Sequence, residues 1–469
     1  RGPGCLLVYW DAGADALSGL QDYRVYANTS SGFTPGPANH IKDVAAGTLS
    51  TMITGLSDGV EQHVIVRARD AAGNTDSNTI EVSRTPGGPA GNAFTAPSSP
   101  EPPFLEGGGG YLTLQADGAD AGGQFGSVVS VIGDIDDDNR DDVLVSAHKA
   151  DPAGLADAGS VYVYSGADGS LLYQYDGAAA GDQFGYSAAG AGDVNNDGTP
   201  DFIVGAYLAD PGGSADAGAA YVFSGADGSL LYAIAGEEAG VRFGSSVGEA
   251  GNIDGDSYRD FIVGAMFASP GGNTRAGSAY VYSGADGSLL YTKNGQQAQN
   301  RFGVSVAGAG DVNNDGRSDF IVGAFFANPG GRSHAGSAYV YSGLDGELLY
   351  QKNGAAIDDR FGYSVSKGGD LNGDGYGEFI VGAYNTNPEG VYDAGTVYVY
   401  SGIDGSPLHK VDGDKHRGNL GRCVAFTGDI DNDGTADSAA GGHFLDSEDA
   451  DDVGAIHMSS SADGTTLYS

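Results

Sequence analysis

The chain repeats itself with a period of 59 residues. Phe125-Gly126 and Phe184-Gly185 are the first two copies of a pair that recurs at this spacing to the end of the chain. The six copies begin at Phe125, Phe184, Phe243, Phe302, Phe361 and, with leucine in place of phenylalanine, Leu420. A period without insertions or deletions means that each copy is one structural unit with constant strand and loop lengths. Six units cover about three quarters of the 469 residues.

Each repeat has the pattern of four short strands. In the second repeat, an alternating stretch and an acidic loop are followed by the apolar run 202–205, a Gly/Pro/Asp-rich segment and two strands joined by Ala-Asp-Gly. Tyr, Val, Phe and Ile at alternate positions between Asp-Gly turns predict antiparallel strands. Four strands per repeat predict an all-β fold, a β-propeller whose radial closure hides strand edges. A linear β-solenoid is the alternative, although its repeats are usually shorter.

The acidic loop is nine residues long and has side-chain oxygens at loop positions 1, 3, 5 and 9. A backbone carbonyl is available at position 7, and glycine at position 6 permits a tight turn in most copies. Ca²⁺ takes six to eight oxygen ligands, so this alternation predicts about six calcium ions, one per repeat. The predicted ligands, with the position-7 carbonyl fourth in each set, are Asp134, Asp136, Asp138, Arg140, Asp142; Asp193, Asn195, Asp197, Thr199, Asp201; Asn252, Asp254, Asp256, Tyr258, Asp260; Asp311, Asn313, Asp315, Arg317, Asp319; Asp370, Asn372, Asp374, Tyr376, Glu378; and Asp429, Asp431, Asp433, Thr435, Asp437.

The charge balance favours cations as partners. The chain has 22 basic and 62 acidic residues, a formal charge of −40, which argues against nucleic acid and anionic membrane surfaces. Three or four carboxylates in one loop repel each other unless a cation neutralises them. Mg²⁺ suits the loops less well, because it prefers fewer carboxylates and several waters. The alternative is that these loops are ordinary hairpin turns. No apolar run of 18 residues predicts a membrane span.

The repeat resembles the FG-GAP repeat of integrin α-subunit propellers and of bacterial surface proteins. The resemblance covers residues 111–469 and rests on Phe-Gly, the acidic loop and a Gly-Ala pair at fixed spacing. The Gly-Ala pairs are Gly205-Ala206, Gly264-Ala265, Gly323-Ala324 and Gly382-Ala383. The resemblance implies a propeller of six visible four-stranded blades, or seven, with Ca²⁺ bound in the acidic loops.

The remaining sequence predicts two further regions. Residues 1–86 read as a small β-sandwich and resemble a fibronectin type III domain, through Trp10, Leu56 and the RARDAAGN segment. Residues 87–108 are predicted to be a Pro/Gly-rich linker, and 109–469 the calcium-binding propeller. Residues 111–118 match the last strand of a repeat, yet the chain ends on the start of another such strand. Either a seventh repeat follows, or one strand is surplus and pairs with a neighbouring molecule. Asn28 opens a glycosylation sequon.

The variable segments of each repeat are predicted to lie opposite the acidic loops, because alternate connections of an antiparallel sheet share an end. Large residues follow each Gly-Ala pair there, and they either contact a partner or fill space between blades. Arg242, Arg301 and Arg360 each precede a Phe-Gly pair. They either receive a carboxylate- or sulfate-bearing ligand or stack on neighbouring aromatic rings.

These features predict an extracellular or cell-surface, calcium-stabilised adhesion or structural protein that binds a protein or surface glycan opposite the calcium loops. One alternative is a subunit of an extracellular filament or surface layer assembled by strand exchange. Another is a glycan-binding protein or glycan-active enzyme. The eight histidines are scattered, and no arrangement typical of a nucleophile or catalytic metal stands out, so we expect no enzymatic activity.

Overall fold

The computed structural model describes residues 6–9, 20–30, 34–35, 38–45, 50–53, 62–70, 82–84, 118, 122–428, 437–442, 455–459 and 466–468. The chain divides into two compact units, Arg1–Asp117 and Gly118–Ser469. Each unit is described by itself.

The first unit contains two antiparallel sheets. A two-stranded sheet pairs β1 (Leu6–Tyr9) with β4 (Ser50–Ile53), and a four-stranded sheet has the order β3 (His40–Ala45), β2 (Leu20–Asn28), β5 (Gln62–Asp70), β6 (Val82–Arg84). Val25, Val64 and Ile65 are buried on the two central strands. The fibronectin type III assignment stays a prediction, and the predicted linker 87–108 lies outside the described residues.

The second unit is built from four-stranded antiparallel sheets, each formed by one repeat with its strands in chain order. The six sheets found among its described residues are β7 (Val129–Gly133), β8 (Asp142–Ala147), β9 (Ser160–Tyr164), β10 (Leu171–Asp176); β11 (Phe184–Gly192), β12 (Asp201–Ala206), β13 (Ala219–Phe223), β14 (Leu230–Ala235); β15 (Ser246–Gly251), β16 (Asp260–Ala265), β17 (Ser278–Tyr282), β18 (Leu289–Asn294); β19 (Val306–Gly310), β20 (Asp319–Ala324), β21 (Ser337–Tyr341), β22 (Leu348–Asn353); β23 (Phe361–Gly369), β24 (Glu378–Ala383), β25 (Thr396–Tyr400), β26 (Pro407–Asp412); and β27 (Cys423–Gly428), β28 (Asp437–Gly442), β29 (Ala455–Ser459), β30 (Thr466–Tyr468). The predicted all-β fold class is confirmed.

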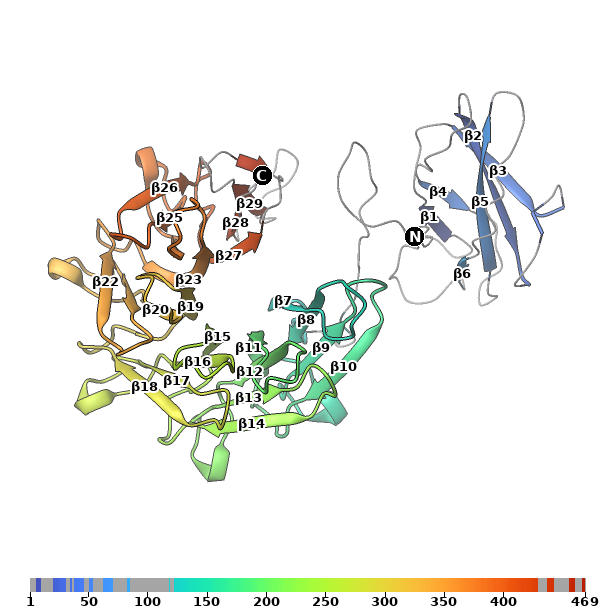
Figure 1. The fold of residues 1–469 in the computed structure, drawn as a ribbon. Coiled ribbons are helices and arrows are strands. Elements are labelled where there is room, and N and C mark those ends of the chain that lie inside the picture. Colours follow the sequence, from blue (N-terminus) through green and yellow to red (C-terminus); the bar gives the residue numbers. More distant parts are fainter. Residues whose placement is uncertain are drawn as a thin grey trace. The chain divides into compact units, whose positions relative to one another are not determined.

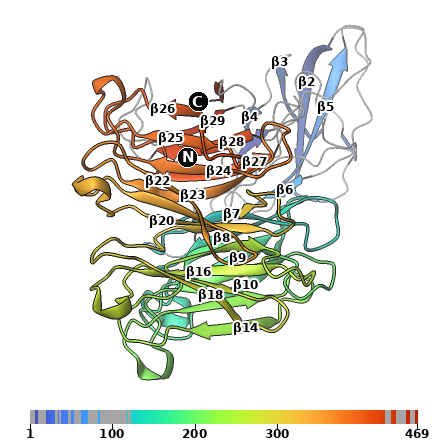
Figure 2. The same ribbon diagram turned by 60° about the vertical axis from the view of Figure 1, so that its left-hand side comes forward.

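The sheets succeed one another along an arc, as the blades of a propeller do (Figure 1). The first strands of successive repeats, such as β11, β15 and β19, lie side by side on the inner side of the arc. The fourth strands, such as β14 and β18, lie on the outer side, and a second view shows the sheets stacked face to face (Figure 2). The radial arrangement predicted from the period is therefore present, whereas the number of blades in a complete ring stays a prediction.

The hydrophobic core is divided among the contacts between successive sheets. All six residues of β16 are buried, because both faces of this second strand are covered by neighbouring sheets. Phe261 of repeat 3 and Phe320 of repeat 4 have no exposed surface. Burying one phenylalanine stabilises the fold by roughly 1.5 to 3 kcal/mol. The apolar runs of β12, β16, β20 and β24 thus form strands that are buried on both faces.

The Phe-Gly and Gly-Ala pairs fasten each repeat to the next. Phe302 at the start of repeat 4 donates its backbone N–H to the carbonyl of Ala276 in repeat 3, at 2.9 Å. The Gly264 backbone lies so close to repeat 4 that an added Cβ would come within 2.1 Å of the Gly303 carbonyl oxygen. The same approach joins Gly323 to Gly362, at 2.0 Å. A side chain would separate the two backbones, which explains why glycine occupies both pairs.

The connections alternate between two ends of the unit. The acidic loops and the Ala-Asp-Gly turns share one end, which we call the loop face. The segments between second and third strands, and those leading into the next repeat, share the other end, which we call the connector face. Each of the first five second-to-third segments contains one short 3₁₀ turn, for example Pro270–Gly272.

Candidate metal centres

The acidic loops join the first strand of each repeat to the second. Their backbone path is fixed by position 1, whose side-chain oxygens accept hydrogen bonds from within the loop. In repeat 4, Asp311 accepts the N–H groups of Asp315 and Gly316, at 3.0 and 2.9 Å. Gly316 adopts φ +88°, a conformation that favours glycine. The carboxylate of Asp315 in turn accepts the Arg317 N–H, at 3.0 Å. These hydrogen bonds hold the acidic loop of repeat 4 in a tight turn around the Asp311 carboxylate.

Position 9 is different, because its carboxylate is buried and belongs to the first residue of the second strand. Asp319 has no exposed surface, and it accepts the N–H of Val312 at 2.8 Å and of Gly343 at 2.9 Å. One oxygen thus holds the start of the acidic loop, and the other holds the turn between the third and fourth strands, Leu344-Asp345-Gly346 in this repeat. Equivalent pairs of hydrogen bonds are made by Asp142, Asp201, Asp260 and Glu378.

Burial disfavours the charged form of these position-9 groups. It raises the pKa of Asp201 and Asp260 to about 6 and that of Asp319 and Glu378 to about 7, although the backbone N–H groups act in the opposite direction. No basic side chain pairs with any of these four carboxylates in the described part of the chain. A nearby cation would lower each pKa and stabilise the ionised form.

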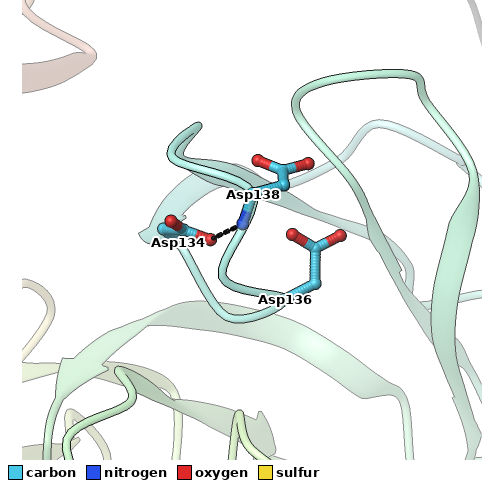
Figure 3. A group of neighbouring side chains, drawn as sticks. All are labelled: Asp134, Asp136 and Asp138. Carbon is cyan, nitrogen blue, oxygen red and sulfur yellow. Dashed lines mark hydrogen bonds between the residues drawn. The ribbon is translucent and has the colours of Figure 1, made fainter.

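Two of the described loops bring three carboxylates together. In repeat 1, the carboxylate oxygens of Asp134, Asp136 and Asp138 lie within 4.8 Å of one another. Figure 3 shows these three side chains on one turn of the loop, where the Asp138 N–H donates to Asp134. Desolvation, together with the charges of Asp142 and Asp138, raises the pKa of Asp136. In repeat 3 the group consists of residues from positions 3, 5 and 9, namely Asp254, Asp256 and Asp260.

The other described loops have asparagine at position 3, so their oxygen set includes an amide. In repeat 4 the Asn313 side-chain oxygen accepts the Asp315 N–H at 3.0 Å, and Asn195 and Asn372 make the equivalent bond. The predicted position-7 carbonyls of the five described loops accept no hydrogen bond from the described residues. These carbonyls belong to Arg140, Thr199, Tyr258, Arg317 and Tyr376. Each of the five described loops therefore keeps one backbone oxygen that no described donor uses.

The third and sixth loops depart from this picture in different ways. In repeat 3, Gly255 stands at position 4 and Ser257 at position 6, where it adopts φ +85°. The Arg317 side chain of the next loop lies against Gly255, where an added Cβ would overlap it. In repeat 6, predicted ligands Asp429, Asp431, Asp433 and Thr435 lie outside the described residues, whereas Asp437 is fully buried at the start of β28.

One feature of the loops was missing from the sequence prediction. The position-9 carboxylate serves the Asp-Gly turn between the third and fourth strands as well as its own loop. It does so through a glycine that follows it by 24 residues in each described pair, such as Asp201 and Gly225. The Ser-Gly pair before this turn in the first five repeats was the available signal. The serine contributes too, since Ser165 donates its hydroxyl to Asp138 at 3.1 Å.

On the connector face, the arginines before the Phe-Gly pairs stack on aromatic rings. The guanidinium carbon of Arg301 lies 3.9 Å from the centroid of Phe267, and that of Arg360 lies 4.3 Å from the centroid of Phe326. Arg242 also approaches Phe267, at 4.3 Å. Stacking, one of the two predicted roles, is therefore confirmed, and the rings that follow Gly-Ala are half-buried in doing so.

Comparison with known proteins identifies the repeats. The family model described as FG-GAP repeat matches residues 184–223, 243–282, 302–341 and 361–400, which are repeats 2 to 5. Each match runs from a Phe-Gly pair to the end of a third strand. The chain therefore contains four FG-GAP repeats, and they form propeller-type blades.

The relatives of this chain include integrin α subunits. The chain is 33% identical over 215 residues to integrin alpha-5 of Xenopus laevis, a match that covers 42% of this chain and 20% of the relative. It is 30% identical over 214 residues to integrin alpha-V of Gallus gallus, covering 43% and 20%, and 31% identical over 179 residues to integrin alpha-PS2 of Drosophila melanogaster, covering 34% and 12%. The matched region thus spans a fifth or less of each of these relatives. Among the described residues, no helix has the length and apolar character needed to cross a membrane.

Proposed function

We propose that this chain, with its four FG-GAP repeats, is an adhesion-type propeller protein that calcium stabilises and that binds a protein ligand on its connector face. The observation that carries the proposal is the repeated position-9 carboxylate. It is fully buried in each described loop, lacks a basic partner in four loops where its pKa is raised, and lies beside further oxygen ligands. Without a bound cation, the ionised position-9 carboxylates of these four loops have no positive charge beside them among the described residues.

The residues present fit Ca²⁺. Hard oxygen ligands come from positions 1, 3, 5 and 9, and the position-7 carbonyl has no donor among the described residues. Three carboxylates within 4.8 Å of one another, as in repeats 1 and 3, are also suited to a divalent ion. Bound calcium would neutralise the loop, and the chain's own residues would hold the loop against the neighbouring hairpin turn.

We place this function outside the cell. Calcium modules of the extracellular kind bind with a Kd of about 0.1 to 1 mM, so they fill where calcium is abundant. We propose binding and not catalysis, since the relatives of this chain include integrin α subunits. The constant backbone of the connector face presents different side chains in each repeat, which suits recognition of a protein surface.

The test is thermal unfolding with calcium and with a chelator. With calcium at about 2 mM, each occupied site contributes about 0.7 to 1.8 kcal/mol, so several sites together raise Tm well above that of the chelated protein. The number of bound ions, measured by isothermal titration calorimetry, is expected to fall by one in Asp311→Asn/Asp315→Asn. Asp345→Asn, which alters a turn aspartate outside the acidic loops, is the matched control and keeps the full number. An unchanged Tm after chelation contradicts the proposal. A monomer in calcium contradicts the filament alternative.

A further inference from the structure

The connector face brings two side chains together at each junction between repeats. One belongs to the second-to-third segment, and the other immediately precedes the next Phe-Gly pair. A backbone hydrogen bond joins the two residues, for example from the Arg301 N–H to the Arg275 carbonyl at 3.4 Å, and from the Arg360 N–H to the His334 carbonyl at 3.2 Å. The five described pairs are Asp157 with Gln183, Asp216 with Arg242, Arg275 with Arg301, His334 with Arg360, and Asp393 with Asn419.

The junction between repeats 3 and 4 differs from the others in charge. Among the described junctions, this is the one at which both paired positions are arginine, Arg275 and Arg301. At the next junction, Asp358 accepts a hydrogen bond from Arg360 at 3.0 Å and contacts His334 at 3.0 Å. The residue equivalent to Asp358 is Gln299, so no such carboxylate is supplied between repeats 3 and 4.

Three guanidinium groups gather around Phe267 at this junction. Their central carbons lie 3.9 Å (Arg301), 4.3 Å (Arg242) and 5.4 Å (Arg275) from the ring centroid. None of the three forms an ion pair with a described residue. Nη1 of Arg301 is buried and has no hydrogen-bond partner there. A buried donor on a charged group is costly to leave unpaired.

We propose that the junction between repeats 3 and 4 binds a carboxylate group that a protein ligand presents, with Arg275 and Arg301 as its hydrogen-bond donors. Guanidinium groups offer paired N–H donors that match the two oxygens of a carboxylate. The flat apolar ring of Phe267 already stacks against the Arg301 guanidinium group. This inference names the ligand chemistry of the connector face and, in that sense, rests on the proposed function.

The net charge of the chain favours a single carboxylate over a polyanion as the ligand of this junction. A formal charge of −40 repels a polyanion such as a sulfated glycan, whereas one glutamate in a neutral peptide segment meets only the local field. Desolvation and the charges of Arg275 and Arg242 lower the pKa of the Arg301 guanidinium. These three guanidinium groups repel one another, and a bound carboxylate would offset that repulsion.

Titration with a blocked glutamate tests the proposal in the full chain. The probe is N-acetyl-glutamate α-methylamide, and the readout is the side-chain Nε–Hε resonances of arginine-selective ¹⁵N-labelled protein. Resonances of Arg275 and Arg301, assigned by single Arg→Gln variants, are expected to shift with a Kd of about 1 mM. The blocked glutamine analogue is expected to leave them unchanged, and inorganic sulfate is expected to bind more weakly than the carboxylate.

A charge swap provides the decisive variant. Gln299 and Asp358 share a backbone conformation, with φ +69° and +63°, and both donate their N–H to the preceding connector at 2.9 Å. Gln299→Asp therefore supplies an internal carboxylate and is expected to weaken probe binding between about tenfold and a hundredfold. Arg360→Gln, at the junction that already has its acid, is expected to bind the probe as the unaltered chain does.

Three results would overturn the proposal: unshifted resonances at 20 times the expected Kd, equal binding by Gln299→Asp, or tighter binding of sulfate than of the carboxylate. Failure here is distinguishable from failure of the proposed function. The titration follows arginines on the connector face, whereas the chelation test follows acidic loops at the opposite end of the unit.

Discussion

The loop face and the connector face use the same repeated backbone for opposite purposes. At the loop face the chemistry is constant, because a buried carboxylate at position 9 makes the same two backbone hydrogen bonds in each described loop. At the connector face the backbone is equally constant, with φ of +51° or +52° at Asp157, Asp216, Arg275, His334 and Asp393. The side chains at these five positions nevertheless include acids, a base and a histidine.

The difference shows that periodicity alone does not identify a functional residue. Constant side chains on a constant backbone maintain the fold, and in this unit they do so by tying two loops of one blade together. Varied side chains in a conserved left-handed conformation are harder to explain by stability, since that conformation costs a residue other than glycine about 1 kcal/mol or more. Recognition of a partner accounts for such variation.

The largest effect is expected from removing a position-9 carboxylate. Asp319→Ala leaves the Val312 and Gly343 N–H groups without their acceptor, and both lie in buried surroundings. We expect the free energy of unfolding in calcium to fall by about 2 to 5 kcal/mol, measured with urea.

The matched control is Asp345→Ala, because Asp345 also accepts a backbone N–H on the loop face, that of Glu347 at 2.9 Å, but is exposed. Its loss is expected to cost less than about 1 kcal/mol. Equal losses in the two variants would show that position 9 has no special structural role.

A smaller effect is expected at the contact between Gly-Ala and Phe-Gly. In Gly264→Ala the new Cβ would lie 2.1 Å from the Gly303 carbonyl oxygen, so repeats 3 and 4 must separate, at a cost of about 1 to 3 kcal/mol. In Gly271→Ala, on the connector face of the same repeat, nothing lies within 4 Å and only the φ of +59° is unfavourable. This control is expected to lose about 1 kcal/mol. Urea unfolding distinguishes the two, and a larger loss at Gly271 would contradict the packing argument.

The stability of the metal-free protein is also expected to depend on pH. Burial raises the pKa of Asp201 and Asp260 to about 6 and of Asp319 and Glu378 to about 7, so the folded state holds protons that the unfolded state has released. Stability is therefore expected to fall as pH rises from about 4 to 7 in chelator. Calcium favours the ionised carboxylates and is expected to abolish or reverse this slope. Tm at pH 5.0 and 7.5, with and without calcium, is the measurement; a chelated protein that gains stability with pH would refute the assignment.

The sequence predicted the fold well because the fold is built from short-range signals repeated at a fixed spacing. Each four-stranded sheet follows from alternation and Asp-Gly turns, and the Gly-Ala and Phe-Gly pairs that join neighbouring sheets recur at the same fixed spacing. The stacking of sheets along an arc follows from second strands such as β16, which are apolar on both faces.

The sites were less predictable, because their geometry depends on contacts between distant residues. Nothing near Asp201 in the sequence indicates that it holds the N–H of Gly225 as well as that of Val194. The arginines were visible as residues before Phe-Gly, but the convergence of Arg242, Arg275 and Arg301 on Phe267 joins positions up to 59 residues apart. The charge at a junction depends on pairs of side chains that come from two successive repeats. Such a pair cannot be seen in the sequence of one repeat alone.

The smallest change in stability is expected from making one junction resemble its neighbour. Asp358→Gln removes the carboxylate that holds Arg360 and His334, each at 3.0 Å. Because the Asp358 side chain is 47% exposed, the free energy of unfolding is expected to fall by only about 0.5 kcal/mol. Binding, in contrast, is expected to gain a second site, since Arg360 then stands on Phe326 as Arg301 stands on Phe267. The ¹⁵N resonance of Arg360 should begin to shift with the blocked glutamate. If it stays unchanged while Arg301 shifts, then an open guanidinium on a ring is insufficient, and the second arginine at position 275 is what makes the junction between repeats 3 and 4 a carboxylate site.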